Sequence, residues 1–415
     1  MRDSARLTAP TLRGVLVVVA TALATRLVTL TILDPVPGVF SGDTPIFMNQ
    51  RGFGYEPPGY PFFLGLTYPW LGAVGVILLQ MIATIGAAVT TYLRIPGKIG
   101  LWTALLIAAC PFFVVYEVRL LTEALVCALL WIALVILIWP KHKWEPVLAG
   151  LLMAGAILGR DTLYFMPLLL PLAALRTARL KAACVAAAVA FLTVLPWQVA
   201  NRSFALSEGR AGLTLWIGTW ETDSTWYRRG LDHPDWPADA FQSPEQKGRI
   251  LQAIRSNDDR TLAAIAIDRM KSAPVDTAKT WAVRYPRLWL GTRTDAVPLR
   301  LDRQSLGWMV AKLGFLILNL LILTVGLVGL WRNRHNPVAR LIAVPIVYIG
   351  AILIPFHNTE TRYSALALMP LLFFGAHALT AFRTAKLKTS ASDSAPPDRF
   401  STTILNEPAA TPSTQ

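Results

Sequence analysis

The first long apolar run decides the fold class: residues 14–33 read GVLVVVATALATRLVTLTIL, with Arg26 as the single charged residue. A helix of this length rises about 30 Å, which is the thickness of the hydrocarbon core of a bilayer. Similar runs recur along the chain, which has 54% hydrophobic and only 15% charged residues. The sequence therefore predicts an all-α polytopic membrane protein with about ten transmembrane helices.

The apolar runs divide the chain into successive parts. Residues 1–200 are expected to form an N-terminal membrane bundle, interrupted by an outer loop at 34–59. Residues 201–307 contain no run long enough to span a membrane, and their mixture of charges and tryptophans predicts one mainly helical domain in water. Residues 308–382 add further membrane helices, and 383–415, rich in Ser, Thr, Pro and Ala, predict a disordered cytoplasmic tail.

Prolines and helix-capping residues predict where several helices begin and end. Prolines and aromatic residues at 60–68 indicate an irregular entry into a helix expected from about residue 70 to about 93. A single helix is expected at about 99–116, and two short ones on either side of Arg160. Ser243, followed by Pro and Glu, is typical of a helix start, and an amphipathic stretch continues to about residue 272.

The distribution of Lys and Arg predicts the orientation. Short loops on the side of the N-terminus collect most of the basic residues, as cytoplasmic loops do. We therefore expect a retained first helix, both termini in the cytoplasm of an inner (plasma) membrane protein, and the loop 34–59 and residues 201–307 together on the periplasmic face. The same rule explains the net charge of +14, so nucleic-acid binding is not expected. The short outer loops hold only Arg51, Arg119, Arg160 and Arg362.

The outer loop carries two carboxylates beside a rigid turn. Asp43 follows Gly42, and a partly desolvated aspartate at a membrane boundary can act as a general base. The alternative is an ordinary aspartate that caps a local turn. Glu56 precedes Pro57 and Pro58, which hold its backbone extended, although it could equally be a solvated acid.

A second group of ionisable residues lies at or near membrane depth, where a charge costs at least about 2.5 kcal/mol. One interpretation is a set of mutual ion pairs and snorkelling side chains. The other is a polar cavity for an anionic, membrane-embedded ligand, because the guanidinium fork suits phosphate. The residues concerned are Arg26, Arg119, Glu123, Arg160, Asp161, Glu360 and Arg362.

Metal and nucleotide signatures are missing from the sequence. The five histidines show no metal-ligand spacing, and the three cysteines lie in apolar runs as buried hydrophobic residues do. The chain has no Gly-rich phosphate loop. We expect neither a metal nor another cofactor.

Four local patterns, taken in order, resemble a known enzyme class. They are Gly42-Asp43 with the later Pro57-Pro58-Gly59-Tyr60-Pro61, Leu121-Thr122-Glu123, Gly159-Arg160-Asp161, and Glu360-Thr361-Arg362-Tyr363. Together they are similar to the GT-C class of integral-membrane glycosyltransferases, and most of all to its protein-mannosyltransferase-like and aminoarabinose-transferase-like branch. Two positions depart from that pattern: Thr44 follows Asp43 where many relatives have Glu, and Asp161 stands where Pro or Gly is usual.

The resemblance implies a GT-C-like fold and a specific reaction. A sugar would pass from a polyprenyl-phosphate donor to an extracytoplasmic glycolipid, polysaccharide or protein, with inversion at the anomeric carbon. Asp43 would be the base, with Glu56 as a second catalytic candidate, and no metal would be needed. The donor phosphate and sugar would be bound by Arg160 and Arg362 first, and by Arg26, Arg119, Glu123 and Tyr363.

Two other functions stay open at this point. An O-antigen polymerase or ligase also has many helices and a large outer loop, and would depend on arginines of that loop such as Arg202, Arg228 or Arg229. A transporter or flippase would show an inverted repeat with broken helices, and no matching pair to the two short helices is visible. The sequence does not specify the sugar or the acceptor.

Overall fold

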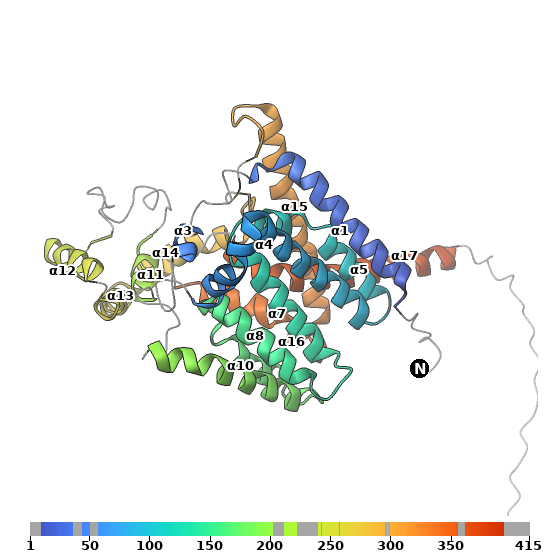
Figure 1. The fold of residues 1–415 in the computed structure, drawn as a ribbon, viewed down its shortest axis with the longest axis horizontal. Helices are drawn as coiled ribbons and strands as arrows, with labels where there is room; N and C mark the ends of the chain where they lie inside the picture. Colours follow the sequence, from blue (N-terminus) through green and yellow to red (C-terminus); the bar gives the residue numbers. More distant parts are fainter. Residues whose placement is uncertain are drawn as a thin grey trace, which may run out of the picture.

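A computed structural model describes residues 10–35, 44–49, 57–201, 211–221, 240–241, 243–256, 258–294, 297, 299–355 and 362–393. Within these ranges the regular structure is helical, apart from one isolated antiparallel bridge between Leu33 and Leu299. A bundle of helices makes up most of the molecule, and a smaller group, α11 to α13, lies to one side of it (Figure 1). The all-α prediction is confirmed for the described residues.

The N-terminal half supplies most of the bundle. Its first helix begins after Thr11, whose hydroxyl accepts a hydrogen bond from the backbone N–H of Gly14 at 3.2 Å. The elements are α1 (Leu12–Ile32), α3 (Thr44–Asn49), α4 (Gly59–Arg94), α5 (Gly97–Ala108), α6 (Pro111–Glu117), α7 (Glu123–Ile138), α8 (Glu145–Gly159), the 3₁₀ turn η1 (Asp161–Leu163), α9 (Met166–Ala173) and α10 (Leu180–Asn201).

The C-terminal half first leaves the bundle and then returns to it. Ser243 caps its helix as the sequence predicts, accepting a hydrogen bond from the backbone N–H of Gln246 at 3.1 Å. The elements are α11 (Ala211–Gly218), α12 (Pro244–Arg255), α13 (Asp259–Ser272), α14 (Pro274–Trp289), α15 (Leu306–Asn333), α16 (Pro337–Ile352), the 3₁₀ turn η4 (Tyr363–Ala367) and α17 (Leu368–Asp393).

Length and composition mark the membrane helices. Of the described residues, five helices are long and apolar enough to cross a bilayer, or six if the bent pair α5 and α6 forms one span. Four shorter apolar segments accompany them, so each predicted span has a helical counterpart, while the number that actually cross stays a prediction. The shorter segments are Glu123–Ile138, Glu145–Gly159, Asp161–Ala173 and Pro337–Ile352.

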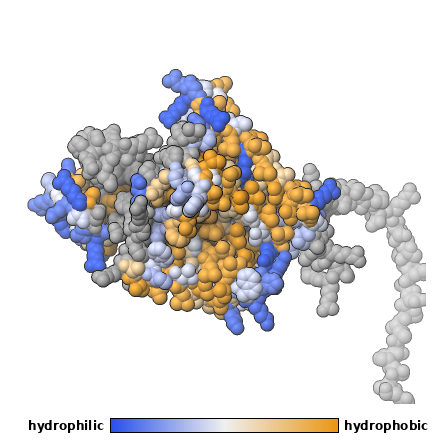
Figure 2. Space-filling model, in the orientation of Figure 1, coloured by the Kyte–Doolittle hydropathy of each residue, from blue (hydrophilic) through white to orange (hydrophobic). Residues whose placement is uncertain are grey.

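The outer surface of the bundle is apolar. Trp70 is 85% exposed and Leu192 66% exposed, and apolar side chains cover the middle of the face in Figure 2, with hydrophilic ones at its margins. Such a continuous apolar surface is unfavourable in water and suits acyl chains. The chain is therefore a multi-pass membrane protein.

The short helix α7 lies at the centre of the bundle. Its 16 residues span about 24 Å, less than the hydrocarbon core, but nearly all of its side chains are buried by other helices. It packs against α4 and α8, while α15 and α17 pack against each other. A helix surrounded by protein need not match the bilayer, which explains why its length falls short.

Several predicted boundaries are wrong. The segment 60–68 is helical, because α4 already begins at Gly59; the irregularity lies at Gly72, which has a φ of 61°. The helix expected at 99–116 is two helices bent by 49° at a break before Pro111. Proline at the first position starts a new helix and lacks the N–H that would continue the old one.

The water-side stretch and the tail also differ from expectation. The helix expected to run to about residue 272 is interrupted, and α13 starts anew with the Asp258 carboxylate accepting from the backbone N–H of Thr261 at 3.1 Å. In the tail, α17 continues to Asp393 through residues such as Ala, Lys and Leu that favour helix. The rest of the predicted disordered tail lies outside the described residues.

Three hydrophobic clusters occur among the described residues, the smallest of them at the start of α4 around Tyr60. The large one fills the bundle, and a small one joins α11, α12 and α13 around Trp216 and Ile250. Helix α14 belongs to the large core through Leu288 and Trp289, so it connects the small group to the bundle. The small core supports a separate domain in this stretch; its position outside the membrane stays a prediction.

Candidate functional site

The candidate site lies at the end of the bundle where α1 finishes and α4 begins, which we call the loop end. Here the backbone N–H of Arg300 donates to the carbonyl of Ile32 at 2.9 Å, beside the bridge between Leu33 and Leu299. The chain that returns from α14 thus meets the start of the segment 34–59. Because both connections meet at this end, the predicted outer loop and the predicted domain share one side of the bundle.

A group of four predicted residues comes together at the loop end, and we call it the arginine cluster: Glu123, Arg160, Arg362 and Tyr363. Arg160 Nη1 donates to Glu123 Oε1 at 3.1 Å, and the Arg160 guanidinium lies 4.4 Å from the centre of the Tyr363 ring. The Arg362 guanidinium lies 4.9 Å from the same ring, and its Nη2 donates to the Tyr363 hydroxyl at 3.0 Å. Two guanidinium groups therefore lie against one phenol ring, and one of them is paired with a carboxylate.

Helix ends explain how the arginine cluster is positioned. Glu123 is the first residue of α7, where the positive end of the helix dipole favours a carboxylate. Arg160 is the extended residue that terminates α8, and Tyr363 opens η4. Arg160 and Glu123 are only 8% and 3% exposed. Three helix termini from distant parts of the sequence thus deliver polar groups to one buried point.

One oxygen in this cluster has no hydrogen bond. Glu123 Oε2 is buried, yet no donor reaches it within the described structure. A buried acceptor left unsatisfied costs about 1–3 kcal/mol, so native structures rarely leave one without reason. This oxygen is available to accept a hydrogen bond from a ligand hydroxyl.

The end of the opening loop is held against the arginine cluster. A Cβ at Gly59 would lie 2.6 Å from the backbone carbonyl carbon of Leu158, so only glycine permits this approach of α4 to the end of α8. The next residue, Tyr60, is buried and donates from its hydroxyl to Gln80 Oε1 at 2.9 Å. The Pro-Pro-Gly turn is therefore packed one residue away from Arg160.

The opposite side of the loop end contains a second buried ion pair. Arg26 Nη2 contacts Glu117 Oε1 at 2.5 Å, and Thr84 donates to the same carboxylate. Gln80 Nε2 donates to the backbone carbonyls of Glu117 and Arg119, at 2.8 and 2.7 Å. The structure thus pairs Arg26 with Glu117, a residue that the sequence analysis did not select, and Gln80 links this pair to Tyr60.

The first half of the opening loop also contacts this end. The Thr44 hydroxyl donates to the carbonyl of Leu120 at 3.3 Å, and the Phe47 ring lies 5.1 Å from the Tyr60 ring. Helix α3 therefore packs on the turn that joins α6 to α7, next to the buried Arg119. Asp43 and Glu56, the predicted catalytic residues, and Glu360 lie outside the described residues.

Sequence reasoning missed a second arginine network at the same end. Arg293 is 3% exposed, and its Nε donates to Asn319 Oδ1 at 2.7 Å and its Nη2 to Ser364 Oγ at 2.9 Å. Its Nη1 lies 3.5 Å from the Tyr116 hydroxyl, and its φ of 60° is uncommon for a residue with a side chain. The sequence feature that could have indicated this network is Asn319, because an amide in the middle of an apolar run needs polar partners.

A further arginine joins α14 to the loop end. Arg284 is fully buried and donates from Nη2 to the carbonyl of Ile354 at 2.8 Å, where α16 ends. Burial lowers the pKa of Arg284 to about 10, and the nearby Glu221 carboxylate opposes that shift. The guanidinium therefore remains charged at neutral pH and connects α14 to the end of α16.

No group of three or more His, Cys, Asp or Glu that could hold a metal occurs in the described part of the chain. Since Asp43, Glu56 and Glu360 are not described, the expectation of a metal-free site stays a prediction. The same applies to the roles assigned to the individual site residues.

Comparison with known proteins gives one kind of similarity. No protein-family model and no curated protein matches the chain. Among solved structures it is similar to the archaeal oligosaccharyltransferase AglB from Archaeoglobus fulgidus in complex with an inhibitory peptide and a dolichol-phosphate, with 14% identity, a TM-score of 0.45, and coverage of 94% of this chain and 52% of that one.

A second similar structure is the Archaeoglobus fulgidus oligosaccharyltransferase tethered to an acceptor peptide that contains the NVT sequon, with 13% identity, a TM-score of 0.45, and coverage of 92% of this chain and 50% of that one. The chain spans about half the length of these structures. Similarity at this level carries no information about the substrate.

The packing of Gly59 can be tested by adding one methyl group. Gly59→Ala forces a Cβ into the backbone of Leu158, so we expect a melting temperature in detergent several degrees below that of the parent protein. Gly65→Ala is the matched control, because nothing lies within 4 Å of its Cβ and alanine favours helix. Equal melting temperatures for the two variants would contradict the described contact.

The Arg293 network can be tested in the same way. Arg293→Ala leaves the buried Asn319 and Ser364 without their charged donor, and we expect a loss of roughly 2–4 kcal/mol of stability. Arg303→Ala removes the same charge from an exposed position nearby and should change stability by less than about 0.5 kcal/mol. Thermal unfolding of the purified proteins measures both, and similar values would refute a structural role for Arg293.

Proposed function

We propose that this protein is a membrane glycosyltransferase that moves a sugar from a polyprenyl-phosphate donor to an extracytoplasmic acceptor, with inversion. The observation that carries the proposal is the arginine cluster, in which Arg160 and Glu123 are buried and Glu123 Oε2 has no hydrogen bond. Guanidinium groups bind phosphate through paired N–H donors, and a buried carboxylate oxygen binds a hydroxyl. A sugar phosphate presents both groups next to each other.

Arg160 and Arg362 would hold the donor phosphate. They flank the ring of Tyr363 at 4.4 and 4.9 Å, which fixes both guanidinium planes on rigid helix termini. Such preorganised cations act most strongly on charge that develops during the reaction, because the site excludes water. Arg119 lies buried on the neighbouring turn and would assist, while Arg26 would act indirectly through its pair with Glu117.

Asp43 would be the general base, and Glu56 an auxiliary acid. Support comes from the residues that flank them: Thr44 packs on Leu120, and Gly59 packs on the end of α8 beside Arg160. With these flanking residues packed near the arginine cluster, we expect the two carboxylates to come within reach of a substrate there. Glu56 precedes the turn that Gly59 completes.

The reaction is a single displacement. Asp43 accepts the proton of an acceptor hydroxyl as that oxygen forms a bond to the anomeric carbon of the donor sugar. The bond between the anomeric carbon and the phosphate oxygen breaks, the electron pair of that bond stays on the oxygen, and polyprenyl phosphate leaves. Attack from the face opposite to the leaving group inverts the anomeric configuration, and Arg160 and Arg362 stabilise the charge on the phosphate.

The apolar surface, the loop end and residues 201–307 suggest how the protein would sit in a membrane. The polyprenyl chain would lie against the apolar surface of the bundle, which is continuous in Figure 2. The chain would cross an inner membrane about ten times with both termini in the cytoplasm, so that the loop end faces the periplasm. Residues 201–307 would form a domain that covers the site and admits the acceptor, which is a glycolipid, a polysaccharide or a protein.

A polymerase or ligase for lipid-linked glycans is the alternative, and would depend on Arg202, Arg228 or Arg229, which lie outside the described residues. Mass spectrometry of the glycolipids and envelope glycans of cells lacking the protein separates these functions. A sugar transferase leaves one residue missing from one glycan, a polymerase leaves single repeat units, and a flippase leaves untransferred donor accumulating.

Loss of the proposed base should abolish transfer. In cells that lack the native protein, Asp43→Asn should restore the missing sugar about 10²–10⁴ times more slowly than the parent protein, because the proton of the acceptor has no base. Asp34→Asn removes a carboxylate from the same predicted loop and should restore it fully. Normal transfer by Asp43→Asn together with its loss in Arg228→Ala would favour the polymerase.

Variants of Arg160 test whether this residue binds the donor phosphate or only stabilises the fold. Arg160→Ala should lower the transfer rate by about 10²–10³-fold, whereas Arg160→Lys should retain part of it because charge remains but the paired donors are lost. Arg287→Ala, an exposed basic residue on α14, serves as the control. Single-turnover transfer measured at saturating donor compares the variants, and an unchanged rate in Arg160→Ala would exclude its role at the phosphate.

A further inference from the structure

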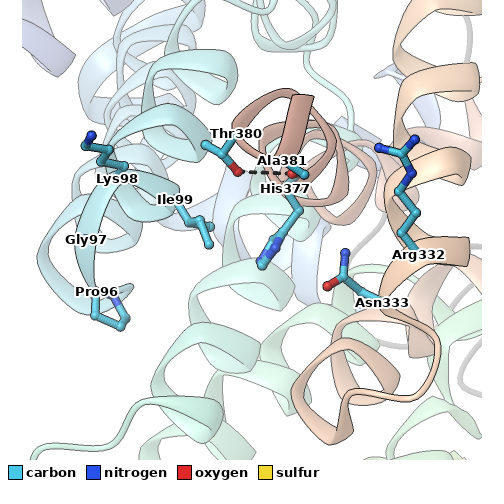
Figure 3. A pocket seen from close by; sticks show the side chains of 9 residues that line it. All are labelled: Pro96, Gly97, Lys98, Ile99, Arg332, Asn333, His377, Thr380 and Ala381. Atoms are coloured by element: carbon cyan, nitrogen blue, oxygen red, sulfur yellow. Dashed lines mark hydrogen bonds between the residues drawn. The ribbon is translucent and has the colours of Figure 1, made fainter. Parts of the chain in front are cut away.

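A pocket opens at the end of the bundle opposite to the loop end, and nothing in the proposed transfer reaction uses it. It has a volume of about 500 Å³ and lies where α5 begins and where α15 and the membrane part of α17 end. Figure 3 shows Lys98 and Arg332 on opposite sides of it, with His377 between them. We propose that this pocket binds the phosphate head group of an anionic phospholipid.

Charge is the first argument. Lys98 and Arg332 are both exposed, their charged groups extend in the same direction in Figure 3, and no lining residue is acidic. Lys98 makes no hydrogen bond or ion pair with any residue that the structure describes. An anion in the pocket would give the Lys98 ammonium an opposite charge to pair with.

The backbone adds donors to the same pocket. Pro96 precedes the first turn of α5, and it supplies no side-chain cap to the N–H groups of that turn. Uncapped N–H groups at a helix start carry partial positive charge and bind phosphate oxygens. His377 and Asn333 line the pocket and add further polar groups.

The surroundings identify the anion as part of a lipid. The three helices that form the pocket expose large apolar side chains close in sequence to its lining residues: Trp331 is 67% exposed, Leu379 47% and Trp102 37%. The Arg334 guanidinium covers the Trp331 ring at 4.2 Å, a pairing typical of the level where head groups meet acyl chains. A head group in the pocket would therefore extend its acyl chains over an apolar surface, which free phosphate would leave uncovered.

The experiment compares lipids on the purified full-length protein. Native mass spectrometry in detergent, with phosphatidylglycerol or phosphatidylcholine added, counts the lipids that remain bound. We expect retention of phosphatidylglycerol, and a loss of its affinity of about 10- to 30-fold in the double variant Lys98→Gln/Arg332→Gln, at about a tenfold change per 1.4 kcal/mol and about 1 kcal/mol per basic residue.

The matched control is Lys181→Gln/Arg340→Gln, which removes two exposed basic residues outside the pocket and should leave affinity unchanged. Equal retention of phosphatidylglycerol by the pocket and control variants, with melting temperatures equal to that of the parent protein, would overturn the proposal. So would equal retention of phosphatidylcholine. Displacement of the lipid by millimolar inorganic phosphate would show an anion site without lipid specificity, which also contradicts the proposal.

Discussion

The arrangement of the loop end depends on the large free-energy cost of burying an unpaired charge among helices that exclude water. Glu117 is fully buried, and its carboxylate is tolerated because Arg26 and Thr84 contact it. Each of these partners comes from a different helix, so satisfying the charge fixes α1, α4 and α6 relative to one another. Gln80 extends the same constraint to the turn before α7. The position of Glu123 and Arg160 then follows from packing.

The polar layer at the loop end differs in kind from the rest of the bundle. Between the two ends of the bundle the core is mainly aliphatic and aromatic, and contacts there are interchangeable within limits of volume. At the loop end the contacts are directional, and most of them join a helix terminus to a side chain of another helix. A site built from helix termini combines rigid support with access from a connecting loop, which explains why polar groups of distant segments gather here.

Much of the helical layout was predictable, because apolar runs of membrane length have few alternative structures. The start of α4 was not, since Pro61 and Pro69 suggested a break where the helix tolerates them and bends at Gly72 instead. Which residues pair with one another was harder to predict than where the residues lie along the helices. Arg160 and Glu123 could be selected by their depth, but that Arg26 pairs with Glu117 is a matter of helix rotation. Arg293 was missed because it follows a polar stretch that surrounds it with ordinary charges.

The bridge between Leu33 and Leu299, with the bond from the Arg300 N–H to Ile32, is made by backbone atoms. It joins the first connection of the chain to the segment between α14 and α15. Because no side chain takes part, sequence drift at these positions leaves the fastening intact, and only proline, which lacks the N–H, would open it. The sequences of the loop and of the domain can therefore change while the backbone contact between these two parts of the chain is kept.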